Sequence, residues 1–104
     1  MKTAYPVIFT KLDDGFAAHA PDFPLDTQGD DYFEAIVMVR DAIGIIGIDM
    51  EDDGKPLPTP SDPQIIMRME NEIVSMVDID FIEYRKNNDR YTALFPVWRS
   101  SEAS

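Results

Sequence analysis

The first third of the chain alternates between apolar runs and turn residues. Residues 3–12 are rich in aromatic and β-branched side chains, which is typical of a strand with apolar groups on both faces. Asp13-Asp14-Gly15 is a turn sequence, and residues 16–20 have the pattern of the returning strand of a β-hairpin. Residues 25–28 predict a third short strand, entered through a proline-containing turn. One face of this meander is expected to pack on a helix, leaving the other free for a partner.

The period of the apolar pattern changes after residue 31. Asp31 and Glu34 have the spacing of a reciprocal capping box, which marks the start of a helix. Glycines at positions 44 and 47 indicate either close approach of a neighbouring element or an early end of that helix. From Tyr32 to about Glu51, apolar residues recur every three or four positions, as in a helix packed on a sheet: Ile36, Val39, Ile43, Ile46 and Met50.

The rest of the chain predicts a linker, a strand, a short helix and a final extended segment. Four prolines between positions 56 and 63 predict a stiff extended connection that crosses the fold. A short helix is expected over residues 81–88, with Asp80 as its cap, and residues 91–98 are expected to be extended. Residues 72–81 alternate as a strand whose buried face would carry four apolar residues: Ile73, Val77, Ile79 and Phe81.

These elements predict an α+β fold: a small antiparallel β-sheet packed by one main α-helix, in the order β-β-β-α-β, then a short helix and an extended strand. Residues 1–90 would form the domain. Residues 91–104 would be a C-terminal segment and tail. A strand beyond a finished domain is a candidate for pairing with a second chain. Phe95 and Trp98 are the residues expected to support self-association.

Charge and composition narrow the range of possible functions. With 20 acidic and 9 basic residues among 104, the net charge of −11 argues against direct phosphate binding and favours a basic partner. The absence of cysteine excludes disulfides and thiolate metal sites. No apolar run has the length of a signal core or a membrane span, so a cytoplasmic location without membrane contact is expected.

Candidate catalytic and metal-binding motifs are incomplete. Residues 49–54 resemble the start of a calcium loop, but Pro60 stands where the bidentate glutamate should be. Asp78 and Asp80 share a strand face, yet a two-metal nuclease site needs further converging carboxylates. His19 has no nucleophile motif near it and is expected to be a half-buried structural residue. We therefore expect no enzyme activity, no bound metal and no cofactor.

The methionines at positions 67, 69 and 76 are expected to be adaptable packing residues rather than part of a cofactor site, because thioethers fill irregular gaps.

The order of the motifs resembles the HicB family of bacterial antitoxins over roughly residues 3–86. One departure is Leu25-Asp26, where the family usually has a Gly-Cys or similar pair and one more residue. The motifs that carry the resemblance are Tyr5-Pro6, Asp13-Asp14-Gly15, Pro21-Asp22-Phe23-Pro24, Thr27-Gln28-Gly29-Asp30 before Glu34-Ala35, Gly54-Lys55-Pro56, and Val77-Asp78-Ile79-Asp80 before Tyr84-Arg85.

The resemblance implies a partial RNase H-like fold and the role of an antitoxin. HicB-like proteins bind and silence HicA, a small basic toxin that cleaves RNA, and the acidic balance of this chain fits such a partner. Many members carry a C-terminal DNA-binding module. We expect this chain to form a homo-oligomer, either a dimer or a tetramer. Residues 92–98 resemble the ribbon strand that begins this module, but its helices do not follow, so no direct DNA binding is expected.

Three functions remain open on the sequence. The first is an antitoxin that covers the RNA-binding or active face of a HicA-type toxin. The second is a diverged, homo-oligomeric module that binds another protein or a small ligand. The third is an RNase H-like metal nuclease. Six residues are expected to contact a partner, although ordinary turn and core roles are also open to them: Tyr5, Phe9, Asp22, Phe23, Gln28 and Asp30.

Overall fold

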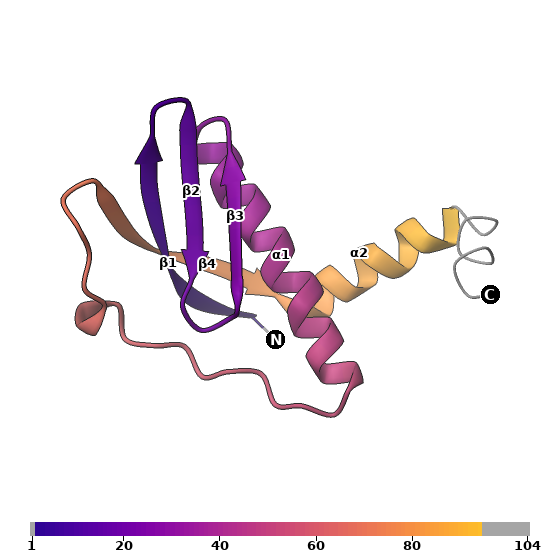
Figure 1. The fold of residues 1–104 in the computed structure, drawn as a ribbon. Coiled ribbons are helices and arrows are strands. Elements are labelled where there is room, and N and C mark those ends of the chain that lie inside the picture. The colour runs from indigo at the N-terminus through magenta and orange to yellow at the C-terminus, as the bar shows by residue number, and fades with distance from the viewer. Residues whose placement is uncertain (1, 95–104) are drawn as a thin grey trace.

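The computed structural model describes residues 2–94, and the positions of side chains for residues 2–87. Within this range the chain forms one four-stranded antiparallel sheet of order β3-β2-β1-β4, in which β4 is an edge strand (Figure 1). The fold class predicted from the sequence is confirmed. The strands are β1 (Lys2–Leu12), β2 (Gly15–Ala20), β3 (Leu25–Gly29) and β4 (Glu72–Asp80).

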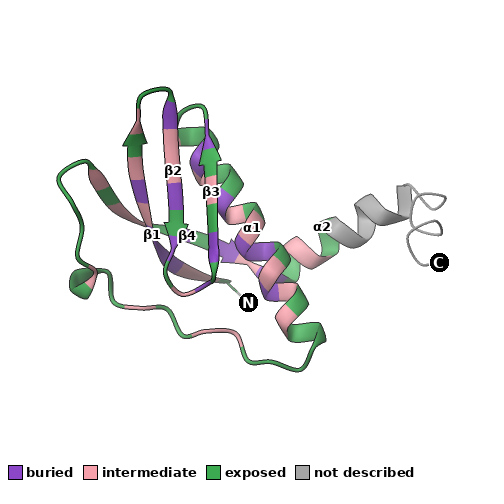
Figure 2. Cartoon of the chain, viewed as in Figure 1, coloured by how far each residue is buried: buried purple, intermediate pink, exposed green. Residues whose placement is uncertain are grey.

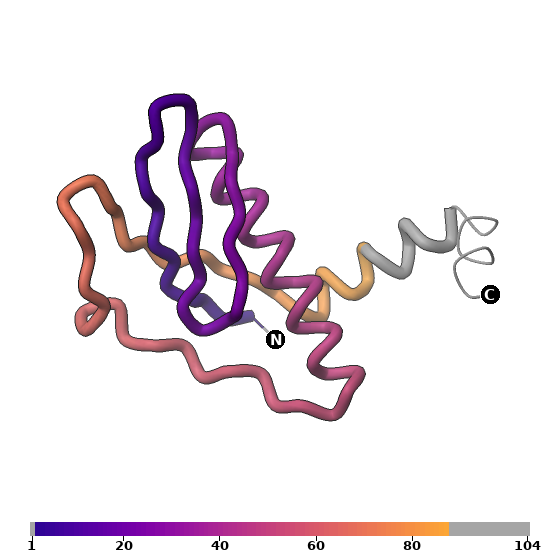
Figure 3. Tube along the Cα trace, viewed as in Figure 1, coloured from indigo at the N-terminus to yellow at the C-terminus, as the bar shows by residue number. Residues whose placement is uncertain are grey.

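One long helix covers one face of this sheet. In Figure 1 the helix α1 (Tyr32–Asp52) runs behind the strands, whereas α2 (Phe81–Leu94) points away from the sheet. A long connection containing the short 3-10 helix η1 (Pro63–Ile65) leads from α1 back to β4, and Figure 3 shows it passing below one end of the sheet. The predicted crossing of the linker is confirmed. None of the described helices has the length and hydropathy needed to cross a membrane.

The core lies between the sheet and α1. Figure 2 shows buried segments on the strands and on α1. Val39 and Ile43 of the helix are both fully buried. Ile36, Ile46 and Met50 are partly buried beside these two, so the predicted apolar stripe of the helix is confirmed. The buried apolar residues are Tyr5, Val7, Phe9, Ala18, Ala20, Phe23, Leu25, Ala35, Val39, Ile43, Val77, Ile79 and Phe81.

The predicted hairpin forms through the glycine of its turn. The strands pair from Ile8 opposite His19 to Leu12 opposite Gly15. Gly15 has φ +149°, a conformation that side chains other than hydrogen rarely allow. The side chain of His19 on β2 is 48% exposed and lies 2.8 Å from an oxygen of Asp26 on β3, so the predicted half-buried position is confirmed.

The start of α1 is capped as its sequence predicts. Asp31 accepts a hydrogen bond from the backbone N–H of Glu34 at 2.7 Å. The carboxylate of Glu34 reaches back to the N–H of Asp30 at 2.8 Å, one residue before the cap. Both bonds satisfy backbone donors that a helix start leaves free.

The two glycines of α1 allow the second helix to approach. A Cβ atom on Gly44 would lie 2.8 Å from the ring of Tyr84, and one on Gly47 would collide with the ring of Phe81. Gly44 and Gly47 are therefore sites of close packing, and α1 continues past both to Asp52. Of the two interpretations of these glycines, close approach is correct.

The end of the described chain differs from the prediction. The helix α2 does not end at Asn88 but continues to Leu94, so residues 91–94 are helical and the predicted extended conformation is wrong there. The residues of Asn87-Asn88-Asp89 cost a helix only a few tenths of a kcal/mol each relative to better formers, which is too little to end it. Residues 95–98, the rest of the predicted strand, lie outside the described residues.

Two predictions about apolar burial are also wrong. Ile73 faces the same side as the core but is 47% exposed. It lies near the end of β4 that is paired with the hairpin end of β1, away from the end where α2 begins. The methionines at positions 67, 69 and 76 are exposed rather than packed into gaps of the core.

Candidate partner-binding surface

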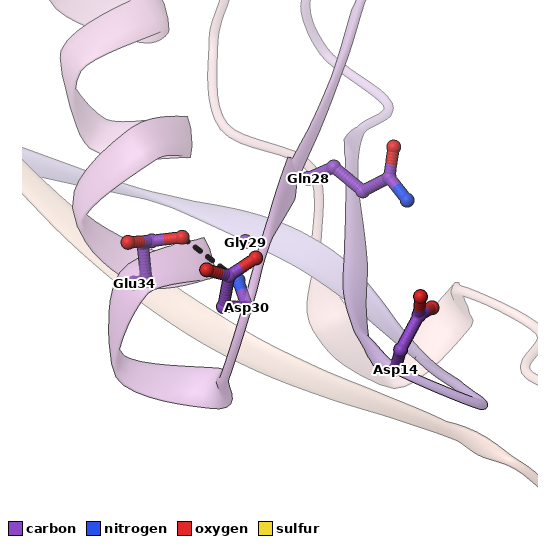
Figure 4. A pocket seen from close by; sticks show the side chains of 5 residues that line it. All are labelled: Asp14, Gln28, Gly29, Asp30 and Glu34. Atoms are coloured by element: carbon purple, nitrogen blue, oxygen red, sulfur yellow. Dashed lines mark hydrogen bonds between the residues drawn. The ribbon is translucent and has the colours of Figure 1, made fainter.

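A recess of about 310 Å³ opens where β3 meets α1. The tip of the hairpin, the end of β3 and the first turn of the helix surround it, as Figure 4 shows. Its lining residues are Asp14, Gln28, Gly29, Asp30 and Glu34.

Two glycines bring the three walls of this recess together. A Cβ atom on Gly15 would collide with the carbonyl oxygen of Gly29, and one on Gly29 would collide with the backbone N of Ala35. The hairpin turn, the end of β3 and the first turn of α1 can therefore approach each other only because neither position carries a side chain. The short turn sequences that predicted the hairpin and the helix start thus also shape the recess.

The recess is acidic. Three of its five lining residues are carboxylates and none is basic. Glu34 is held in place by the backbone N–H of Asp30, whereas the side chains of Asp14 and Asp30 are exposed. Among the described residues no group of three His, Cys, Asp or Glu side chains has the arrangement that would hold a metal ion. A lysine or arginine side chain suits such a recess, because carboxylates are strong acceptors for these donors.

Two of the six residues predicted to contact a partner line this recess. Gln28 and Asp30 are both exposed there, and Figure 4 shows Asp30 beside Glu34 and Gln28 pointing away from them. Asp22 lies elsewhere and has a structural role: its carboxylate accepts hydrogen bonds from the backbone N–H and the hydroxyl of Ser61. Asp22 therefore fastens the linker to the turn between β2 and β3.

The other three predicted residues are in the core. Tyr5, Phe9 and Phe23 are 2%, 0% and 2% exposed, so their side chains offer almost no surface to a partner. The rings of Tyr5 and Phe23 pack edge to face with centroids 4.8 Å apart. Their role is the ordinary core role that the sequence also allowed. Phe95 and Trp98, predicted to support self-association, lie outside the described residues.

Comparison with known proteins gives matches in structure and none in sequence. Neither a protein-family model nor a curated protein sequence matches the chain. A chain of a toxin-antitoxin complex from Streptococcus pneumoniae superposes with a TM-score of 0.73 and 28% identity, over 81% of this chain and 73% of that one. A chain of the HicA3 and HicB3 toxin-antitoxin complex gives a TM-score of 0.62 and 25% identity, over 75% of this chain and 99% of that one.

The fold is one found in toxin-antitoxin complexes. Both matches extend over three quarters or more of this chain, so the similarity includes the sheet and the long helix rather than a single motif.

Asp78 and Asp80, the pair considered for a metal site, are both engaged in structural contacts. Arg40 of α1 donates to the backbone oxygen and to the carboxylate of Asp78, each at 2.9 Å. The hydrogen bond and the charge of Arg40 lower the pKa of Asp78 below its ordinary value. Asp80 accepts from the N–H of Glu83 at 3.1 Å, which caps α2 and lowers the pKa of Asp80. These contacts stabilise the junctions of β4 with the two helices.

The outward side of α1 also carries apolar residues that the sequence reading did not single out. Phe33, Val37, Met38 and Ile45 are exposed on this helix. These four residues lie outside the predicted apolar stripe of the helix, which faces the sheet. The number of apolar residues in this helix was the signal that could have identified them, because a helix packed on one sheet needs only one apolar side.

Proposed function

We propose that this chain is an antitoxin of the HicB type, which binds a small basic toxin of the HicA type and covers its RNA-binding or active face. The observation that carries the proposal is the match to chains of two toxin-antitoxin complexes, one of which contains HicA3 and HicB3. The ordered motifs of the sequence and the net charge of −11 support the same assignment.

The charge explains how such a protein would silence an RNA-cleaving toxin. A protein that cleaves RNA must attract the phosphate backbone with basic groups. An acidic protein that occupies those groups competes with RNA for the same positive charges, and opposite charges also speed the encounter of the two proteins. Inhibition then needs no chemical reaction, so we propose that the chain acts by binding and has no catalytic activity of its own. We place this action in the cytoplasm.

Coexpression tests the proposal. Each neighbouring gene that encodes a small basic protein would be induced alone and together with this chain, and growth and RNA integrity would be measured. We expect the basic protein alone to stop growth and degrade RNA, and coexpression to restore both. The two proteins should also elute together in size-exclusion chromatography. Growth arrest that persists despite coexpression, with no shared elution peak, would contradict the proposal.

A homo-oligomeric binding module is the second candidate, and a group of exposed apolar side chains on β4 and on the segment before it favours it, because β4 is an edge strand of the described sheet. An edge strand has backbone N–H and C=O groups with which a strand of a second copy could pair. Light scattering at several protein concentrations tests self-association: a mass of two or four chains supports it, and a constant monomer mass contradicts it. The side chains concerned are Ile65, Met67, Met69, Ile73 and Met76.

A further inference from the structure

The side of α1 that faces away from the sheet has an unusual composition for a surface helix. Phe33, Val37, Met38 and Ile45 are 73%, 41%, 46% and 52% exposed. Phe33 and Ile45 are 12 residues apart in sequence, or about 18 Å along the helix axis at ~1.5 Å per residue. A helix packed on a sheet normally presents polar residues to water. We call these four residues the α1 apolar strip.

The charges around this strip are almost all negative. The helix contains five acidic residues and one basic residue, Arg40. Arg40 is already engaged, because its guanidinium binds Asp78 on β4. Helical periodicity places Glu34, Asp41 and Asp49 among the residues of the strip rather than on the buried side, and all three are exposed.

The strip is continuous with the acidic recess. Glu34 lines the recess and is adjacent in sequence to Phe33, the most exposed member of the strip. Figure 4 shows Glu34 on the first turn of α1 beside Asp30. A partner that packs on Phe33 and Val37 would therefore bring neighbouring basic side chains to the mouth of the recess.

We propose that the α1 apolar strip, together with the recess, is the surface on which a cationic protein docks. This proposal rests on the proposed function and adds the location of the interface. Apolar side chains of the partner pack on Phe33, Val37 and Ile45, and a lysine or arginine enters the recess between Asp14 and Asp30. Such an apolar centre with charged surroundings is the usual anatomy of a protein interface.

The negative charge of α1 favours a cationic protein over a second copy of the chain as the binding partner. Two copies that met through α1 would bring their acidic residues together, and like charges across an interface oppose association. The exposed apolar residues on and before β4 do not favour a cationic partner in this way, because a positive residue, Arg68, and a negative residue, Glu70, both lie among them. Among the described residues, the α1 surface thus combines exposed apolar side chains with mostly negative charge.

Site-specific photocrosslinking in the native host tests the location. The photoreactive residue p-benzoylphenylalanine would replace Phe33 or Ile45, and in a control it would replace Ile65, which is 73% exposed like Phe33. We expect Phe33 and Ile45 to cross-link to one protein whose sequence pI is above about 9, and Ile65 not to cross-link to it. Mass spectrometry of the adduct identifies the protein.

The purified adduct protein then gives an affinity measurement. Phe33→Lys and Ile45→Lys should each raise its Kd by about tenfold or more, because each removes an apolar contact and adds a repelling charge. Ile65→Lys should change the Kd less than about twofold. Circular dichroism and thermal unfolding check that all three variants remain folded.

Every other outcome overturns the proposed location. A basic protein that cross-links through Ile65 alone would leave the proposed function standing but move the interface to β4. Adducts of Phe33 or Ile45 with a second copy of the chain would make α1 a self-association surface. If no position cross-links while coexpression still rescues growth, the interface lies elsewhere; if rescue also fails, the proposed function fails with it.

Discussion

Ser61 donates two hydrogen bonds to Asp22, one from its backbone N–H to Oδ2 at 2.8 Å and one from its hydroxyl to Oδ1. Thirty-nine positions separate the two residues in sequence. Three residues before Ser61, the carbonyl of Pro58 accepts a hydrogen bond from the hydroxyl of Tyr5 at 2.8 Å. The linker between α1 and β4 is therefore fastened to the sheet at two points, one on β1 and one on the turn that follows β2.

Replacing Asp22 tests the first attachment. Asp22→Ala removes both acceptors and leaves the N–H of Ser61 without its partner, so we expect the free energy of unfolding to fall by about 1–3 kcal/mol. Urea denaturation measures this change, and hydrogen exchange of the Ser61 amide should become faster. Glu70→Ala, at an exposed position with a similar charge, is the control and should have an effect within about 0.5 kcal/mol. Equal stabilities of the two variants would contradict the attachment.

Tyr5 makes the second attachment and is sensitive to alkaline pH. Burial, and then the charge of Asp22, raises the pKa of Tyr5 above 10.0. Because the pKa of Tyr5 is higher in the folded protein than in the unfolded chain, the protonated hydroxyl of Tyr5 stabilises the fold. This stabilisation is complete below about pH 10 and is lost as pH rises through the folded-state pKa.

Tyr5→Phe removes both the hydrogen bond and this titration. Below about pH 10 the variant should be less stable than the wild type by about 1 kcal/mol, the net worth of one hydrogen bond. Above that pH the difference should shrink, since only the wild type loses the contribution of Tyr5. Urea denaturation of both proteins between about pH 8 and pH 11 measures the difference. A difference that stays constant over this range would contradict the prediction.

Gly47 tests the packing of α1 against α2. In an isolated helix Gly→Ala adds about 1 kcal/mol of stability, but here the new Cβ would collide with the ring of Phe81. We therefore expect Gly47→Ala to destabilise the protein by about 1–3 kcal/mol in thermal or urea unfolding. The double variant Gly47→Ala with Phe81→Leu should lose less free energy of unfolding than the sum of the losses of the two single variants. A stabilised Gly47→Ala variant would show that α2 does not pack there.

The parts of the fold that the sequence predicted well depend on local chemistry. The turn at Gly15 and the cap at Asp31 need few neighbours, because a positive φ and a free backbone donor restrict which residues fit. The helix stripe through Val39 and Ile43 follows from periodicity alone. These signals placed the hairpin and the start of α1 correctly.

The parts that were predicted poorly depend on contacts between distant segments. Alternation placed Ile73 on the core side, but it could not show that this residue would remain 47% exposed. Phe23 lies in a turn sequence and was predicted to contact a partner, but its burial depends on a ring contact with Tyr5, 18 positions away in sequence. Gln28 and Asp30 were chosen as turn residues of a recognisable motif, and the recess that joins them to Asp14 requires the tertiary structure.

Arg40 and Asp78 connect α1 to β4 and should make stability depend on acid pH. The pKa of Asp78 lies below 3.8 in the folded protein, first because Arg40 donates a hydrogen bond to it and then because of the charge of Arg40. Because the pKa of Asp78 is lower in the folded protein than in the unfolded chain, its carboxylate stabilises the fold at any pH above the unfolded-chain pKa. This stabilisation is lost as pH falls through the folded-state pKa. The wild type should therefore be more stable than Asp78→Asn near pH 7, and the difference should narrow below about pH 4.

A double-mutant cycle supplies the control for this ion pair. Arg40→Gln should reproduce the loss seen in Asp78→Asn, and the double variant should lose less than the sum of the two. Guanidinium chloride would mask the charges, so urea denaturation is the measurement. Additive losses, or an unchanged difference at acid pH, would contradict the role of this pair.

The acidic recess should govern how fast the basic partner binds. Asp14→Asn with Asp30→Asn removes two negative charges from the recess and leaves Glu34 and its hydrogen bond to the backbone intact. Glu70→Gln with Glu83→Gln removes the same charge from exposed positions outside the recess and is the matched control. Stopped-flow binding of the partner identified by cross-linking should show a several-fold lower association rate constant for the recess variant at low salt, and a smaller difference at about 0.5 M salt, where the Debye length falls to ~4 Å. Because both variants have the same net charge, an equal decrease in the two would mean that only the total charge of the protein attracts the partner and that the recess has no part in the encounter.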